Sequence, residues 1–219
     1  MYKPLIVFCI ILISFNSDMK AMDKKPYHHI YKDGELFAFR NPEGSPQRNP
    51  NFKWKWKVFR EKKKNIKINY PPEHIIDRQL VLRNLEKHKS DSYVMWLDHA
   101  SFIIKLGDTT IITDPVFENY YGYLSFGTKK YIEPPLKLKE LPEINLFLLT
   151  HNHLDHMSQK TINNFPYKNT KVLVPLKLGK YFTKNGYKKD KVTEMDWFDK
   201  IKINEEISIT MLPSQHWSK

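Results

Sequence analysis

Apolar and polar positions form a regular series of short segments from residue 93 onward. Tyr93–Leu97, Phe102–Leu106 and Thr109–Thr113 are rich in β-branched and aromatic residues, which is typical of strands. Gly107-Asp108 predicts a turn between the last two of them. We therefore expect three consecutive strands at the start of a folded domain.

The next segments alternate between strand and helix patterns. Ile144–Leu149 is almost entirely apolar, which predicts a strand covered on both faces. Met157–Phe165 has the apolar spacing of a helix, with Met157, Thr161, Ile162 and Phe165 on one side. The remaining expected elements are a strand at Lys171–Val174, a helix at Leu176–Tyr187 closing near Asn185-Gly186, and strands at Val192–Met195 and Ile207–Leu212. This alternation predicts an α/β fold.

The first 90 residues have a different character. Residues 16–50 are polar and contain the chain breakers Asp33-Gly34, Asn41-Pro42 and Asn49-Pro50, which favour an extended arm. We divide the chain into a signal or membrane-anchor segment (1–25), a basic aromatic arm (26–90) and the α/β domain (91–219).

An apolar run, Leu5–Phe15, follows Lys3. Its eleven residues are too few to span a membrane, which takes about 20, but they suit a secretory signal. The alternative is a buried strand. We expect an exported protein, either periplasmic or associated with a membrane. Cys9, the single cysteine, excludes an intrachain disulfide, and without a CxxC pair a zinc finger is excluded too.

Positive charge is concentrated in the first part of the chain. The net charge is +12, and residues 1–90 hold 19 Lys and Arg against 9 Asp and Glu, while residues 91–219 hold 17 against 15. In Phe52–Arg60 aromatic and cationic residues alternate, and Lys62–Lys64 follow. This pattern suits an anionic phospholipid surface or nucleic acid, but packing of the aromatic rings against the domain, with the lysines in solvent, is the leading interpretation.

The strongest chemical feature lies directly after the expected strand Ile144–Leu149. His151, His153, Asp155 and His156 fall within six residues, and imidazoles with a carboxylate are preferred ligands of zinc. Residues two apart in an extended loop point the same way, so His151 and His153 can bind one ion. Asp155 and His156 can then reach a second ion, which predicts half of a two-metal hydrolytic site.

Three further residues are candidates for this site. His216 follows the expected strand Ile207–Leu212 and can complete the coordination by His151 and His153. His99 and Asp114 are candidates for orienting the metal ligands, because a metal-bound imidazole usually donates its other N–H to a carboxylate or carbonyl. His28, His29, His74 and His88 receive no role from their polar surroundings.

These residues resemble the signature of a known superfamily. His151–His156 is similar to the HxHxDH motif of metallo-β-lactamase proteins, within which the chain resembles the branch of N-acyl-phosphatidylethanolamine-hydrolysing phospholipase D and its bacterial relatives. The segments that carry this resemblance are Trp96–Phe102, with Asp98 where glycine is usual, Thr113–Phe117, Pro213–Ser218 and, more weakly, His28-His29 and Phe39–Pro42.

The resemblance implies an αββα sandwich and two zinc ions. His151, His153 and His216 would hold one ion, and Asp155 with His156 the other, with Asp155 also the catalytic carboxylate. Water activated between the metals would cleave a phosphodiester bond of an N-acylated phospholipid, while the arm holds the enzyme on its membrane. Iron or manganese suits the same ligands, and nucleic acid is not an expected partner.

The family's second half, with a metal-bridging aspartate and a final histidine, has no counterpart before Lys219. We therefore expect an incomplete domain with at most one well-formed metal site, or a chain that pairs with a complementary C-terminal chain. Two other functions stay open: hydrolysis of a soluble lactone or phosphodiester metabolite, and a non-catalytic remnant that binds membranes.

Overall fold

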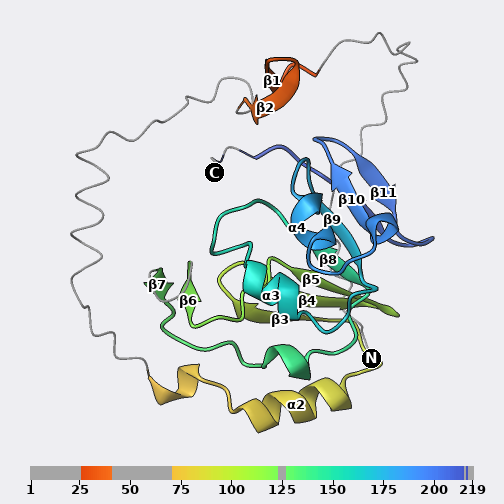
Figure 1. The fold of residues 1–219 in the computed structure, drawn as a ribbon. Helices are drawn as coiled ribbons and strands as arrows, with labels where there is room; N and C mark the ends of the chain where they lie inside the picture. The colour runs from red at the N-terminus through yellow and green to blue at the C-terminus, as the bar shows by residue number, and fades with distance from the viewer. Residues whose placement is uncertain (1–25, 41–70, 123–126, 215, 217–219) are drawn as a thin grey trace.

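The computed structural model describes residues 26–40, 71–122, 127–214 and 216, which Figure 1 shows as a coloured ribbon. The apolar run Leu5–Phe15 and the aromatic segment Phe52–Arg60 lie outside these residues. Among the helices described, none has the length and apolar character needed to cross a bilayer.

A six-stranded mixed sheet, in the order β10-β9-β8-β5-β4-β3, forms the centre of the fold (Figure 1). Strands β3, β4 and β5 pair antiparallel, whereas β5, β8, β9 and β10 run parallel. The α/β prediction is confirmed, and each predicted segment of this sheet forms a strand. The strands are β3 (Tyr93–Asp98), β4 (Ser101–Leu106), β5 (Thr109–Thr113), β8 (Leu146–Leu148), β9 (Lys171–Pro175) and β10 (Val192–Met195).

Three helices cover one face of this sheet. Val81, Ile162 and Phe182, one from each helix, belong to a buried cluster that also contains Ile112 and Phe147 from the strands. These helices are α2 (Arg78–Lys87), α3 (Gln159–Asn164) and α4 (Gly179–Thr183), and short 3-10 turns lie at η1 (Pro72–His74), η2 (Leu138–Glu140) and η3 (Lys189–Lys191).

The opposite face is buried by a hairpin of β11 (Lys200–Lys202) and β12 (Ser208–Thr210). Its Ile201 and Ile209 pack against a second buried cluster that includes Leu146 and Leu173. Because neighbours along β5, β8 and β9 enter opposite clusters, these strands are apolar on both faces, as the continuous run Ile144–Leu149 predicts. Two further hairpins are β1 (His29–Lys32) with β2 (Glu35–Phe39), and β6 (Tyr120–Tyr121) with β7 (Thr128–Lys129).

Several sequence predictions differ from the structure in detail. Residues 16–50, predicted as an extended arm, contain the β1–β2 hairpin. The predicted turn at Asp33-Gly34 is confirmed, with φ of 51° and 82°, and it joins the two strands of the hairpin. The helix at Leu176–Tyr187 is shortened to α4, because Lys177 has a φ of 70° and Gly186 a φ of 86°, which no right-handed helix accommodates.

The Asp77 side chain caps α2, since its Oδ1 accepts a hydrogen bond from the Leu80 N–H at 3.0 Å. We expect Asp77→Ala to lower the free energy of unfolding by about 1 kcal/mol, because one N–H of the first turn loses its partner. Chemical denaturation measures this, with Asp108→Ala, in an exposed turn, as the control. Equal stability of both variants would contradict a capping role.

Candidate metal centre

The carboxyl ends of β5 and β8 position the histidine-rich loop. The strands are parallel neighbours, so the residues that follow them emerge at the same edge of the sheet. The Asp114 N–H donates to the Leu148 carbonyl at 3.0 Å, and the Leu149 N–H donates to the Leu173 carbonyl at 3.0 Å. The loop that begins at Thr150 is therefore fixed to the sheet at its first residue.

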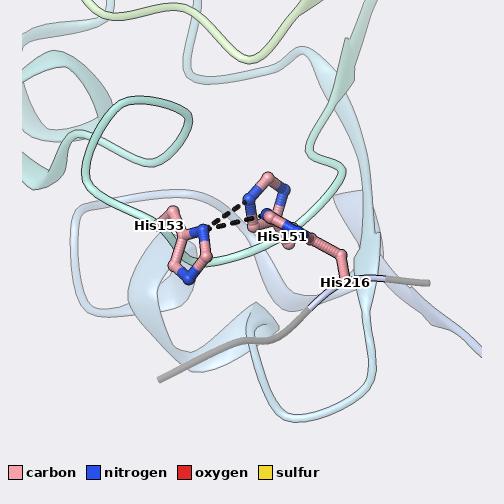
Figure 2. Close-up of side chains that lie close together, drawn as sticks. All are labelled: His151, His153 and His216. Carbon is pink, nitrogen blue, oxygen red and sulfur yellow. Dashed lines mark hydrogen bonds between the residues drawn. The ribbon is translucent and has the colours of Figure 1, made fainter. Parts of the chain in front are cut away.

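Three imidazoles converge beyond this edge, as Figure 2 shows. The Nδ1 atom of His153 lies 3.0 Å from Nε2 of His151 and 3.1 Å from Nε2 of His216. His153 is buried, His151 is half-buried and His216 is exposed. His216 arrives from the far end of the chain, 63 residues after His153.

A second group, made of His99, Asp155 and His156, lies beside the first. Nε2 of His99 is 3.1 Å from Oδ2 of Asp155, and Nε2 of His156 is 4.0 Å from the same oxygen. The ring centroids of His151 and His156 are 4.0 Å apart, so the two groups are adjacent. In each group one ligand atom from every residue lies within 4.8 Å of the others.

The Asp114 carboxylate orients one histidine of each group through hydrogen bonds. The side chain of Asp114 is 1% exposed, and Oδ2 accepts from His156 Nδ1 at 2.7 Å and from the Thr150 hydroxyl at 2.5 Å. Because the Thr150 hydroxyl donates to Asp114, it accepts from His151 Nδ1, 2.9 Å away. Both Nδ1 atoms are thus used as donors, and the Nε2 atoms of His151 and His156 keep their lone pairs.

Electrostatics favour metal-binding forms of these side chains. Burial, reinforced by the neighbouring His156, His153 and His216, lowers the pKa of His151 to about 4, so its imidazole is neutral at physiological pH. Burial alone raises the pKa of Asp155, but its own backbone N–H and the nearby imidazoles bring that pKa below its ordinary value. The site therefore offers a neutral imidazole from His151 and an ionised carboxylate from Asp155.

This donor set fits a divalent metal of the zinc type. Zinc binds imidazole nitrogen at about 2.0–2.1 Å, which separates neighbouring ligands of a tetrahedral ion by about 3.3 Å. The 3.0 and 3.1 Å separations of the three histidine nitrogens match that spacing. His151, His153 and His216 would hold one ion, and Asp155 and His156 would offer ligands to a second.

The structure brings together all the residues that the sequence singled out. His151, His153 and His216 meet in one group, Asp155 and His156 lie in the next, and Asp114 lies behind them. His99, predicted as an orienting residue, contacts Asp155 directly and belongs to the second group. Sequence reasoning missed Thr150, whose place beside the first histidine was the available signal.

The turn that carries His99 rests on a buried ion pair. Lys130 Nζ lies 2.6 Å from Oδ2 of Asp98, and the Tyr121 hydroxyl donates to the same carboxylate at 2.5 Å. Lys130 also donates to the Val116 carbonyl at 2.5 Å, and its side chain is 2% exposed. The Asp98 carboxylate thus ties the end of β3 to β6 and to the residue that follows β7.

The comparisons agree with this fold. A family model described as "Beta-lactamase superfamily domain" matches residues 109–219. The chain belongs to the β-lactamase superfamily, and the sequence-based recognition of that family is confirmed. The metallo-β-lactamase type of fold is confirmed as well, with its central mixed sheet.

Two relatives are similar to this chain in sequence. N-acyl-phosphatidylethanolamine-hydrolyzing phospholipase D 1 of Caenorhabditis elegans is 30% identical over 203 residues, which are 84% of this chain and 55% of that protein. The mitochondrial N-acyl-phosphatidylethanolamine-hydrolyzing phospholipase D of Saccharomyces cerevisiae is 28% identical over 61% of this chain and 29% of its own length. The chain thus spans about half or less of these relatives.

Among solved structures, a possible metal-dependent hydrolase from Veillonella parvula is similar to this chain. The two share 23% sequence identity, with a TM-score of 0.42, over 52% of this chain and 44% of the other.

Proposed function

We propose that this protein is a zinc-dependent hydrolase of phosphodiester bonds, acting on N-acylated phosphatidylethanolamine or a similar phospholipid. The observation that carries the proposal is the convergence of three imidazole nitrogens: Nε2 of His151 and Nε2 of His216 lie 3.0 and 3.1 Å from Nδ1 of His153. A ring nitrogen carries at most one proton, so without a cation Nδ1 of His153 cannot donate a hydrogen bond to both of the nitrogens that lie next to it.

The three histidines and the residues beside them support hydrolysis rather than metal storage. His151, His153 and His216 are all imidazoles, which leave a zinc ion with a fourth position for a reactant. When bound, zinc supplies Lewis acidity at the reacting oxygen and makes a nucleophile available at neutral pH. Asp155 adds a half-buried carboxylate in the adjacent group, and Nε2 of His99 lies 3.1 Å from its Oδ2.

Asp114 supplies the rigidity that catalysis requires. Through Thr150 it holds the His151 ring, and directly it holds the His156 ring, so neither imidazole is free to turn its Nε2 away. A ligand set fixed in advance avoids reorganisation when charge develops on the substrate.

The lipid substrate is supported by two separate facts. Two relatives are named as phospholipases D that hydrolyse N-acyl-phosphatidylethanolamine. Residues 1–90 carry a net charge of +10, which favours attraction to the anionic surface in which such a substrate resides. We propose that this membrane surface is the partner of the protein, and that the protein is exported to reach it.

The experiment compares His153→Ala with His88→Ala, a matched change at an exposed histidine paired with Asp91. We expect His153→Ala to lose bound zinc and to hydrolyse N-acyl-phosphatidylethanolamine at least about 100-fold more slowly, because one of three ligands is gone. Zinc content by elemental analysis and phosphatidic acid release from vesicles containing phosphatidylglycerol are the measurements. His88→Ala is expected to behave as the wild type.

The substrate panel separates the alternatives. Cleavage of bis(p-nitrophenyl) phosphate or of an acyl lactone, without cleavage of the phospholipid, would replace the lipid substrate by a soluble metabolite. A wild-type protein that binds less than one zinc per chain and hydrolyses none of these compounds contradicts the proposal and leaves the non-catalytic remnant.

A further inference from the structure

A second cluster of metal-ligand side chains lies outside the centre described above. His28 and His29, at the start of the β1–β2 hairpin, meet Asp196, which directly follows β10. Nε2 of His28 is 2.8 Å from Oδ1 of Asp196, and Nε2 of His29 is 2.7 Å from Oδ2. Each oxygen of one carboxylate therefore faces a different imidazole.

Local backbone geometry turns the two histidines to the same side. Consecutive residues of a strand point to opposite faces, but His28 lies in a turn in which the His29 N–H donates to the Pro26 carbonyl at 3.0 Å. The ring centroids of His28 and His29 are consequently 4.6 Å apart. The start of the hairpin thus presents two imidazole nitrogens to the Asp196 carboxylate.

Burial makes this contact costly if it is only a set of hydrogen bonds. The side chains of His28, His29 and Asp196 are 6%, 8% and 18% exposed. His29 Nε2 lies close to Asp196 without hydrogen-bond geometry, and His28 Nδ1 has no hydrogen-bond partner among the described residues. Buried polar atoms left unsatisfied are uncommon, and an ion is one of the explanations they call for.

Aromatic rings enclose the cluster. Trp197 stacks on His28 with centroids 4.4 Å apart and planes at 16°, and Phe39 meets His29 edge-on at 5.4 Å. These rings keep water away and hold the imidazoles in one orientation, as the surroundings of metal ligands do. The backbone N–H of Trp197 donates to Asp196 Oδ1 at 2.8 Å, which fixes the carboxylate as well.

We propose that His28, His29 and Asp196 form a separate mononuclear site for a zinc-type divalent cation, which fastens the β1–β2 hairpin to the end of β10. Two imidazoles and a carboxylate are a ligand set that zinc accepts, and the ligand atoms lie within 4.8 Å of one another. This cluster and the histidine-rich loop lie at the same edge of the sheet. The strands that precede them, β10 and β8, are two strand spacings apart, about 10 Å, so the two sites are separate. The role of the proposed site is to join segments 168 residues apart in the chain.

The test counts zinc in the whole protein. Wild type, Asp196→Asn and the matched control Asp190→Asn, in an exposed 3-10 turn, are purified with zinc and dialysed against a weak chelator. We expect Asp196→Asn to hold one zinc fewer per chain than the other two proteins. Equal zinc content in all three overturns the proposal and makes the cluster a hydrogen-bonded clamp.

A second measurement isolates the site from the catalytic centre. In His151→Ala/His153→Ala, added zinc is expected to slow amide hydrogen exchange of residues 27–39, and this protection is expected to vanish when Asp196→Asn is added. Protection that is absent in the first protein, or unchanged in the second, contradicts the proposal. Neither result depends on phospholipid hydrolysis, so failure here is distinguishable from failure of the proposed function.

Discussion

Asp114→Asn is expected to bind zinc about 10- to 100-fold more weakly than the wild type, because outer partners of metal ligands contribute to affinity on that scale. Asp114 receives hydrogen bonds from the Thr150 N–H, the Thr150 hydroxyl and His156 Nδ1. An amide offers one acceptor oxygen in place of two, so at least one of these donors loses its partner. The measurement is competition for zinc with a chromophoric chelator.

Two further variants bracket that result. Thr150→Val interrupts the link to His151 but leaves the His156 contact, so we expect a smaller loss of affinity than with Asp114→Asn. Asp108→Asn, in the exposed turn between β4 and β5, is expected to bind zinc as the wild type does. If Asp114→Asn keeps wild-type affinity within about threefold, Asp114 does not orient the ligands.

Lys130→Met is expected to lower the free energy of unfolding by about 3–5 kcal/mol, since it leaves the Asp98 carboxylate partly buried without its cation. The Lys130 side chain is 2% exposed and that of Asp98 is 17% exposed, so solvent screens their charges weakly. Burial lowers the pKa of Lys130 and Asp98 opposes that shift, which indicates an ion pair held against desolvation. Denaturant unfolding followed by circular dichroism measures the change.

A double variant separates charge from packing. Asp98→Asn/Lys130→Met removes both charges, and we expect it to recover part of the stability that Lys130→Met loses. Lys129→Met, at the neighbouring exposed lysine, is the control and should leave stability within about 0.5 kcal/mol. A loss below about 1 kcal/mol in Lys130→Met would show that the ion pair is not a main support of the His99 turn.

The sheet could be predicted because each strand carries its own pattern. Thr109–Thr113 and Val192–Met195 were predicted with the observed bounds, since β-branched runs flanked by turns specify a strand locally. Helix α2 was missed although Val81, Leu82 and Leu85 stand at helical spacing and lie in or against the buried cluster, because most of its other positions are polar or charged. The turn at Asp33-Gly34 was predicted from its breaker residues, and positive φ at both positions is what a tight hairpin needs, but the strands on either side were not predicted.

The candidate site could be predicted only where its residues are neighbours in sequence. His151, His153, Asp155 and His156 are adjacent along the chain, and their spacing already indicates a shared ion. Long-range partners carry no such pattern. Lys130 contacts Asp98, 32 residues away in sequence, and Asp196 contacts His28, 168 residues away. These contacts follow from the fold rather than from any local motif.

Two residues beside the centre adopt a left-handed backbone conformation. His99 has a φ of 41° and Asp114 a φ of 39°, a region in which a non-glycine residue is held at a cost of about 1 kcal/mol. Part of the stability produced by the buried core is therefore stored as conformational strain at the ends of β3 and β5. The packing that holds this strain also fixes the direction in which the two side chains leave the sheet.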